Sequence, residues 1–352
     1  MSIYDYAAVI HFHSSFSFDG HIPPDKIIAA AARQGVDILL LTDHDNLQAR
    51  AAGWEGWQGK VLIIVGQEIS PRFNHYLAFN IENPVTCPED VEGINPQHYI
   101  DEVNAAGGFG IIAHPDHEGT KTFHVKHYPW KDWSVNGYTG ISIWDFMTDW
   151  QSSLSGYLSG LLSYYFPAFF LRGPRAVTLQ RWDAQNAGKK IVGIGELDNH
   201  ASRKMLGGIT FEAFPFDKAF TFIRTHIITT EPLSGNKEKD ISLVFQSIRS
   251  GSCYVALDYF RNARGFDFGM RNSVKQALMG ESLLLDNKTF LEVNLPCVAH
   301  CRIIKDGSVL AEERKKEVSM PITARGVYRV EAYLKSYGKY RPWIYSNPIY
   351  VK

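Results

Sequence analysis

Residues 7–13 read Ala-Ala-Val-Ile-His-Phe-His, a run of small and apolar residues that ends in two histidines. The apolar part predicts a buried strand, and His11 and His13 stand two apart at its carboxyl end. Alternate residues of a strand point to the same side, so both imidazoles are expected to reach one cation. A lone pair of this kind is usually satisfied by ordinary hydrogen bonds, so its meaning depends on the rest of the chain.

The first two-thirds of the chain alternates short apolar runs with helical segments, which is typical of β/α units with parallel strands. Further strands are expected at residues 38–41, 61–65, 110–113, 140–144 and 190–195. Helices are expected at residues 24–34, 96–106, 177–186, 216–225 and 241–249. Beyond about residue 259, apolar and polar residues alternate between turn signals, as in small antiparallel β structures. The sequence therefore predicts an α/β region followed by a C-terminal β domain.

Histidines and carboxylates recur beside these expected strands. The set consists of His11, His13, Asp19, His44, Glu68, His75, His114, Asp198 and His200. The carboxyl ends of the strands in a parallel β/α barrel converge on one face, so these side chains are expected to meet there. Six imidazoles and three carboxylates are too many for one cation. They predict two or three divalent ions, with Zn²⁺, Mn²⁺ and Fe²⁺ all suited to nitrogen and oxygen ligands.

The order of these motifs resembles the polymerase and histidinol phosphatase (PHP) superfamily. The motifs are His11-x-His13, Asp19-Gly20, Thr42-Asp43-His44, Glu68, His114-Pro115 and Asp198-x-His200. The two-domain branch that includes carbaryl (carbamate ester) hydrolases is similar over further stretches. These are the segment with Trp144, the Trp182-Asp183 pair, and residues 251–258 and 341–348. The resemblance implies an α/β fold with a distorted (β/α)7 barrel of PHP type in residues 1–257. It also implies an all-β, immunoglobulin-like sandwich in residues 258–352.

The resemblance also implies how the ligands divide among the ions. One ion would be held by His11, His13, Glu68 and Asp198. Glu68 would bridge to a second, held with His75 and His114. A third would be held by Asp19, His44 and His200. Asp19 stands where some members have histidine, and Glu196 departs from the family's usual strand end; its carboxylate is expected either to orient an imidazole or to be a solvated or capping group.

The function predicted from these ligands is that of a metal-dependent hydrolase. A phosphoesterase of a small phosphorylated substrate, working through a metal-bridging hydroxide, is the main expectation. The same ions would also serve hydrolysis of a carbamate, amide or carboxylic ester. A third alternative is a binding or regulatory module that retains metal with little turnover.

Further residues near the ligands are candidates for catalysis. His117 could act as the acid for the leaving group, or make a loop hydrogen bond. Arg72 and Arg203 could bind phosphate or carboxylate oxygens, or form surface ion pairs. Asp43 and Asp45 could hold the tautomer of His44, or make turn and cap hydrogen bonds. The serines at 14, 15 and 17 are expected to satisfy backbone groups of a turn rather than act as nucleophiles.

An insertion is expected at about residues 117–175, and its uncharged segment 152–171 invites a membrane interpretation. Gly156, Gly160 and Pro167 interrupt that segment, so a buried or lid-forming helix is expected rather than a membrane span. A surface that touches a lipid-like substrate is the alternative.

Composition sets limits on partners and compartment. The formal net charge of −1 gives no indication of a nucleic-acid partner. Four scattered cysteines without a CxxC pair, and a start without a secretory pattern, favour a reducing, cytoplasmic setting. The expected partner is a small phosphoester, carbamate or ester substrate, and the oligomeric state is left open.

Overall fold

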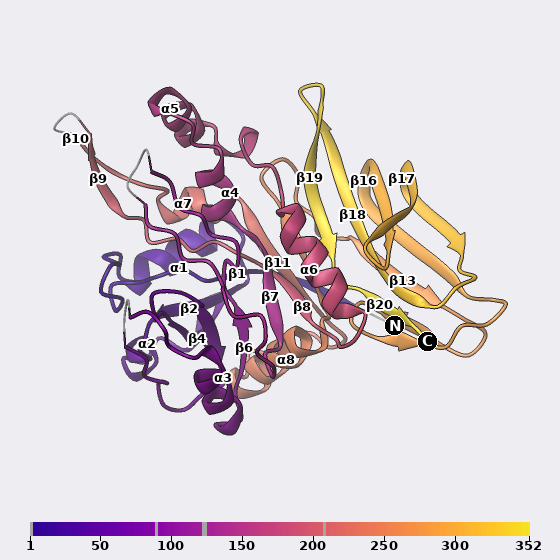
Figure 1. Ribbon diagram of the computed structural model, residues 1–352, viewed down its shortest axis with the longest axis horizontal. Helices are drawn as coiled ribbons and strands as arrows, with labels where there is room; N and C mark the ends of the chain where they lie inside the picture. Colours follow the sequence, from indigo (N-terminus) through magenta and orange to yellow (C-terminus); the bar gives the residue numbers. More distant parts are fainter. Residues whose placement is uncertain (1–2, 89–90, 122–124, 207–208) are drawn as a thin grey trace.

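A computed structural model describes residues 3–88, 91–121, 125–206 and 209–352 (Figure 1). Residues 122–124 of the expected insertion lie outside this description. The N-terminal part is a mixture of helices and strands, and the C-terminal part is built almost wholly of strands. The predicted division into an α/β region and a β region is confirmed, while the boundary at residue 257 stays a prediction.

Seven strands of the N-terminal region carry or flank the candidate ligands. In order of pairing they are β1 (Tyr4–Ile10), β2 (Ile38–His44), β4 (Val61–Ile69), β5 (Tyr76–Phe79), β6 (Phe109–Ile112), β7 (Gly140–Asp145) and β8 (Val192–Glu196). Their apolar side chains are nearly all buried, which explains why the strands read as continuous apolar runs.

Strand β5 runs against its neighbours, whereas the other adjacent pairs in this order are parallel. Only residues 70–75 connect β4 to β5, and a parallel pair needs a crossover of a dozen residues or more. The prediction of uniformly parallel strands is therefore wrong at β5. Because β5 begins where β4 ends, His75 at its start lies at the same edge as the carboxyl ends of the parallel strands.

Backbone hydrogen bonds join the segment that follows β8, the last strand in this order, to the end of β1, the first strand. Leu197 N donates to Ile10 O at 3.0 Å, and Asp198 N donates to His11 O at 2.9 Å. One step further on, His13 N donates to the carbonyl oxygen of Asn199 at 3.0 Å. The segments that follow the first and the last of the seven strands are thus held side by side.

The edge of β1 that faces away from β2 leads towards the C-terminal region. Strand β11 (Ile223–Thr229) pairs antiparallel with β1, β12 (Cys253–Leu257) pairs with β11, and β12 also pairs with β19 (Lys339–Ser346). The helix predicted at residues 216–225 is wrong over most of its length, because only α7 (Phe216–Ala219) is helical. The β-branched residues from Ile223 onward suit a buried strand better than a helix.

Four longer helices lie close to the predicted positions. They are α1 (Pro24–Arg33), α3 (Pro96–Ala105), α6 (Ala176–Asn186) and α8 (Lys237–Ser250). Helix α8 begins earlier than expected because the Asn236 side chain accepts a hydrogen bond from Lys239 N. It ends at Gly251, whose φ of 77° is left-handed. The short elements α2 (Gln48–Ala51) and β3 (Gly56–Gln58) complete this part of the region.

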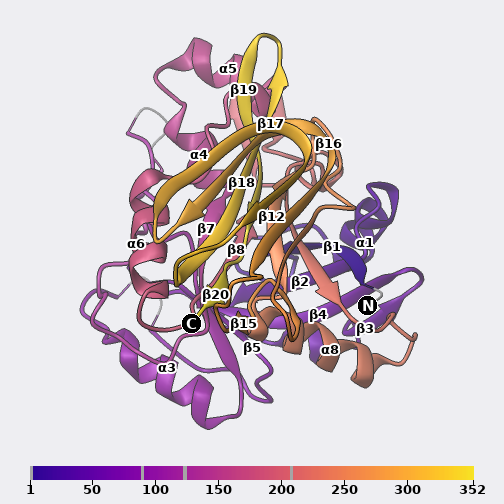
Figure 2. The same ribbon diagram turned by 90° about the vertical axis from the view of Figure 1, so that its right-hand side faces the viewer.

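The C-terminal region packs its own apolar core. Its strands are β13 (Asp267–Arg271), β14 (Gln276–Leu278), β15 (Ser282–Leu283), β16 (Phe290–Lys305), β17 (Ser308–Pro321), β18 (Gly326–Ser336), β19 and β20 (Ile349–Val351). Figure 1 shows the long strands to the right of the N-terminal region, and in Figure 2 they face the viewer. A buried ion pair joins the two, since the Arg329 guanidinium on β18 contacts the Asp183 carboxylate on α6 at 2.7 and 2.8 Å.

The uncharged segment forms three short pieces, α4 (Phe146–Ser152), α5 (Tyr157–Tyr165) and the 3-10 helix η1 (Pro167–Phe169). Among the described residues, no helix is long and apolar enough to cross a membrane. Of the two expectations for this segment, the buried helix is wrong for α5, in which only Ser163 is buried, and the lid-forming helix stays a prediction. The hairpin of β9 (Arg203–Leu206) and β10 (Ile209–Glu212) projects near it (Figure 1).

A buried histidine outside the ligand set ties β1 to β11 and β12. His226 Nδ1 lies 2.7 Å from Asp5 Oδ1, and its Nε2 lies 3.2 Å from Asp258 Oδ2. Burial lowers the pKa of His226, but hydrogen bonds to Asp258 and Asp5 outweigh it and raise this pKa to about 9. Tyr254 and Arg224 complete the cluster through Asp5 and Asp258 respectively.

The His226 contacts predict a pH-dependent stability. The pKa of His226 in the folded protein lies above its value in the unfolded chain. Protonated His226 therefore contributes its full stabilisation to the folded protein below about pH 6.5, and this stabilisation is lost as pH rises through about 9. Between pH 6.5 and 9.5, the wild type should lose about 2 to 3 kcal/mol more unfolding free energy than His226→Gln. Urea unfolding of both proteins, with exposed His98→Gln as control, measures this. Equal losses would contradict the ion pairing.

Candidate metal centre

The structure brings the nine predicted ligands together at one edge of the sheet. Each follows or ends a parallel strand, precedes β5, or lies on the loop after β1. Within each of three groups, the ligand atoms lie within 4.8 Å of one another. The groups are His11, His13, Glu68 and Asp198; Glu68, His75 and His114; and His13, Asp19, His44 and His200.

Glu68 occupies the middle of the cluster and is 1% exposed. Its two carboxylate oxygens lie within 3.4 Å of imidazole nitrogens from five histidines. Oε2 is near His11 Nε2 (3.1 Å), His13 Nε2 (3.4 Å) and His44 Nδ1 (3.2 Å), and Oε1 is near His75 Nδ1 (2.8 Å) and His114 Nε2 (3.1 Å). Because candidate metal ligands face each of its two oxygens, the Glu68 carboxylate has the geometry needed to bridge two cations.

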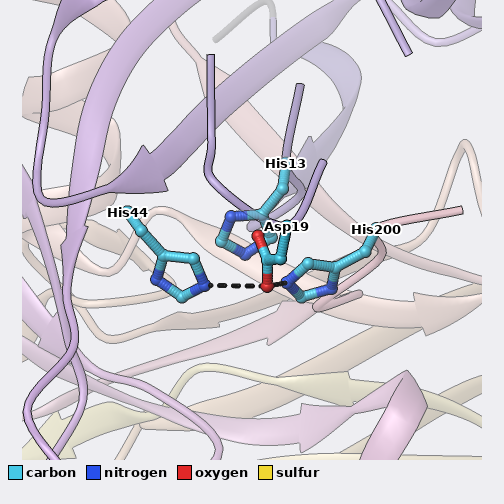
Figure 3. A group of neighbouring side chains, drawn as sticks. All are labelled: His13, Asp19, His44 and His200. Carbon is cyan, nitrogen blue, oxygen red and sulfur yellow. Dashed lines mark ion pairs between the residues drawn. The ribbon is translucent and has the colours of Figure 1, made fainter. Parts of the chain in front are cut away.

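The third group, shown in Figure 3, is the outer group, because the Asp19 side chain is 34% exposed whereas that of Glu68 is 1% exposed. Asp19 Oδ2 is 2.9 Å from His200 Nε2 and 3.4 Å from His44 Nε2. The ring of His13 stacks against both of their rings, with its centroid 4.0 Å from that of His200 and 4.4 Å from that of His44. His13 thus belongs to the first and third groups at once, whereas the sequence predicted it for the first alone.

The hydrogen bonds of the rings fix which nitrogen faces the centre. His11 Nδ1 lies 2.9 Å from Glu196 Oε2, His75 Nε2 lies 2.9 Å from Pro71 O, and His200 Nδ1 lies 3.2 Å from Asp198 O. A ring that donates N–H outward keeps a lone pair on its other nitrogen, which is the form that binds metal.

Several inward atoms lack hydrogen-bond partners among the described residues. These buried atoms include His11 Nε2, His13 Nε2, His44 Nδ1 and Glu68 Oε2. Burying lone pairs without a donor is unfavourable. Cations at these positions would satisfy the nitrogen and oxygen atoms together, so the residues present fit a multinuclear divalent metal centre.

The charges in the cluster are strongly coupled. Burial raises the pKa of Glu68, but the charges of His11, His44 and His75 outweigh it and hold this pKa well below its usual range. Burial lowers the pKa of His44, and Glu68 and Asp19 raise it to about 9. Ionised carboxylates therefore favour positive charge at this edge, whether it is carried by protons or by metal ions.

Three ligands adopt left-handed backbone conformations. The φ angles are 64° at His11, 24° at His114 and 50° at Asp198. His11 therefore lies outside the regular strand, and strand alternation is the wrong reason for its meeting with His13. Such conformations are uncommon in residues other than glycine and cluster at functional sites. This strain is a feature that sequence patterns did not reveal.

Glu196 binds two of the candidate ligands on the side away from Glu68. Its Oε2 contacts His11 Nδ1, and its Oε1 accepts a hydrogen bond from His114 N at 2.5 Å. The structure therefore decides between the two expectations for this carboxylate: it orients an imidazole and is fully buried. By contrast, Asp43 accepts from Ser14 and Asp45 accepts from Ser70, so both carboxylates bind segments distant in the sequence. The His44 ring contacts Glu68 and Asp19 instead.

The loop that carries Asp19 is closed by a serine and a glycine. Ser17 Oγ donates to Asp19 Oδ1 at 2.9 Å and lies 3.3 Å from His13 Nδ1. A Cβ on Gly20 would lie 2.0 Å from Ser14 O, so only glycine allows this tight turn. Ser17 was expected only to satisfy the turn; its contact with two ligands was missed because it depends on how the loop folds.

The three other predicted catalytic residues differ in their surroundings. His117 is buried, with its ring 5.6 Å from that of His114, and its Nδ1 accepts from Tyr128 N. Burial and the neighbouring His114 lower the pKa of His117 to about 3. Arg72 donates to His127 O and lies on the rings of Phe73 and Tyr128. Arg203 is exposed on β9.

The comparisons agree with the N-terminal geometry. Residues 10–113 match the PHP domain family model. That span includes six of the nine candidate ligands, from His11 to His75. The N-terminal region is therefore PHP-like. No curated protein matches the chain.

Three solved structures are similar at low identity. One is a two-domain protein from Bacteroides vulgatus that contains a predicted PHP-like metal-dependent phosphoesterase (14% identity, TM-score 0.45, 98% of this chain and 95% of that one). Another is a protein from Bifidobacterium adolescentis provisionally named a metal-dependent phosphoesterase (14%, 0.32, 58% and 92%). The third is an amidohydrolase from Chromobacterium violaceum with bound sulfate and no metal (16%, 0.32, 59% and 92%).

The contacts of Glu196 predict its effect on metal binding. Glu196→Gln should weaken metal affinity about 10- to 100-fold, because the amide makes His11 a less basic and less firmly oriented ligand. Titration of metal-stripped protein against a competing chelator measures the change. Asp240→Asn, which alters a buried carboxylate at the start of α8, is the matched control. Unchanged affinity in Glu196→Gln would contradict its positioning role.

Proposed function

We propose that this protein is a metal-dependent hydrolase, and specifically a phosphoesterase of a small phosphorylated substrate. The observation that carries the proposal is the buried Glu68 carboxylate, with five imidazoles around it and inward atoms that lack hydrogen-bond donors among the described residues. The PHP domain match over residues 10–113 supports it independently.

The three ligand groups would hold two or three divalent ions, with Zn²⁺, Mn²⁺ or Fe²⁺ as candidates. When bound, such ions supply Lewis-acid chemistry: they acidify water and neutralise charge that develops on an ester. The protein contributes the arrangement. Glu68 links the groups, Glu196 orients His11, and Ser17 holds Asp19 near His13.

The outer group is the side from which a substrate would approach. The Asp19 side chain is 34% exposed, whereas Glu68 is almost completely buried. His200 and Asp198 are also partly exposed. A phosphate group entering there would meet Asp19, His44 and His200 before the inner ligands. His117 is proposed to act as a neutral hydrogen-bond donor through Nε2, since its Nδ1 already accepts from Tyr128 N.

The finer fold assignment is part of the same proposal. The pairing order of seven strands and its return from β8 to β1 support a distorted barrel of PHP type. The separate apolar core of β13 to β20 supports a sandwich domain after residue 257.

A second candidate function is hydrolysis of an aryl carbamate, amide or carboxylic ester. The observation that favours it is Phe18, whose side chain is 67% exposed and whose ring lies 4.8 Å from that of His44 at an interplanar angle of 25°. An exposed ring stacked on a candidate ligand offers a wall for an apolar leaving group.

A substrate panel distinguishes the two functions. Purified protein with its metals quantified is offered phosphomonoesters, phosphodiesters, aryl carbamates and aryl esters. Release of phosphate or cleavage of phosphodiesters is the expected result. Turnover of carbamates or esters without any phosphoester cleavage would overturn the first proposal in favour of the second.

His200→Ala tests the outer group. The variant should lose about one equivalent of metal, and its hydrolytic rate should fall at least about a hundredfold, because a Lewis acid contributes several kcal/mol to the transition state. Metal analysis and steady-state rates check this, with exposed His98→Ala as the matched control. Full metal content together with full activity in His200→Ala would argue against the outer group.

Phe18→Ala tests the apolar wall. Loss of one stacking partner should raise KM for an aryl substrate about two- to tenfold. The methyl analogue of the same substrate should be turned over with unchanged KM, because it has no ring to stack. An equal change for both substrates would show that Phe18 affects the metal ligands rather than the leaving group.

A further inference from the structure

Helix α5 exposes an unusually apolar surface. Its exposed large side chains, together with the residue that follows the helix, are Tyr157, Leu158, Leu161, Leu162, Tyr165 and Phe166. Residues 151–171 contain no charged side chain. We call these six residues the α5 face. Contiguous exposed apolar side chains of this size mark interaction surfaces in soluble proteins.

The α5 face is exposed although the helix itself is firmly attached. Trp150 Nε1 donates to Ser163 Oγ at 3.1 Å, and Tyr164 OH donates to Glu212 O at 2.8 Å. The ring of Tyr164 also lies 5.7 Å from that of Phe214. One side of α5 is thus used for attachment, and the leucines and tyrosines of the α5 face are held away from the core.

A second projection ends on the same side of the molecule. Figures 1 and 2 both show α5 and the tip of the β18–β19 hairpin rising together from one end. Tyr337 at this tip is 82% exposed, and its ring lies 5.1 Å from that of Phe169 in η1. Arg341 Nη1 donates to Phe169 O at 3.0 Å. These contacts join the hairpin to the segment that follows α5.

The hairpin tip and the residue that follows the uncharged segment carry positive charges. The hairpin tip reads Lys335-Ser-Tyr-Gly-Lys-Tyr-Arg341, with three cations and no acid. Lys335 and Lys339 are exposed, and so is Arg172, which follows the uncharged segment directly. Leucines flanked by tyrosines and cations suit the boundary between the acyl chains and the head groups of an anionic bilayer.

We propose that the α5 face and the β18–β19 tip dock this protein on an anionic lipid surface. Helix α5 has nine residues, so it would lie along the interface rather than cross it. The apolar side chains would enter the head-group region, and Lys335, Lys339 and Arg172 would face the lipid phosphates. This inference does not depend on the proposed hydrolase activity.

Docking would place the candidate metal centre beside the lipid. Tyr164 of α5 binds Glu212 O, and the Glu212 carboxylate lies 3.6 Å from His21 Nε2. His21 belongs to the loop that carries Phe18 and Asp19. A chain of contacts thus leads from the docking helix to the exposed side of the outer ligand group.

Vesicle flotation tests the proposal with the full-length protein. Wild type should float with vesicles of phosphatidylcholine containing about 30% phosphatidylserine, and much less with phosphatidylcholine alone. Leu158→Ser/Leu161→Ser/Leu162→Ser should lower partitioning at least about tenfold, because it removes apolar area from the interface. Lys335→Glu/Lys339→Glu should lower it at least about fivefold per lysine on anionic vesicles.

The control is a pair of equally exposed apolar residues elsewhere. Val274 is 88% exposed and Leu284 is 70% exposed, and both lie near β14 and β15. Val274→Ser/Leu284→Ser should leave flotation unchanged. Circular dichroism and metal content, equal in all variants, show that the fold persists.

Three results would overturn the inference. Wild type could fail to float with anionic vesicles, or the control variant could lose binding as strongly as the α5 variant. Light scattering could instead show a dimer that the α5 variant converts to a monomer, without any vesicle binding by the wild type. That last result would assign the α5 face to a second copy of the chain.

Discussion

The burial of one carboxylate, Glu68, among five imidazoles is the interaction on which the N-terminal region depends. A buried charge costs several kcal/mol unless opposite charges and hydrogen bonds surround it. Here the compensating groups are imidazoles at or next to the ends of β1, β2, β5 and β6, so each of these strands must begin or end close to Glu68. The reversal of β5 meets one such demand, because it brings His75 to the edge where the parallel strands finish.

The members of the histidine and carboxylate cluster, and most strands, could be predicted from the sequence because both are local features. An apolar run followed by histidine or a carboxylate is visible without knowledge of the partner strands. The direction of β5 was not predicted because it depends on the short turn after β4. Residues 223–225 were predicted as helix but form a strand, because they belong to β11, which pairs with β1. The dual contact of Glu196 likewise requires β8 to lie beside the end of β1.

In the insertion, the sequence predicted an element but not its exposure to solvent. An uncharged, apolar run predicts burial on average, yet α5 turns those residues outward while Trp150 and Tyr164 secure its other side. Hydrophobicity alone does not distinguish a core helix from one that meets another surface. The link from α5 through Glu212 to the loop with Asp19 could be found only from the folded arrangement.

The left-handed residues His11, His114 and Asp198 have a consequence for how this protein can evolve. Each conformation costs on the order of 1 kcal/mol or more for a residue with a Cβ atom, and glycine would relieve it. Mutational drift towards greater stability would therefore favour glycine at the very positions that supply ligands. Side chains at these three positions therefore lower the stability of the fold, so the supply of candidate ligands is opposed by backbone strain.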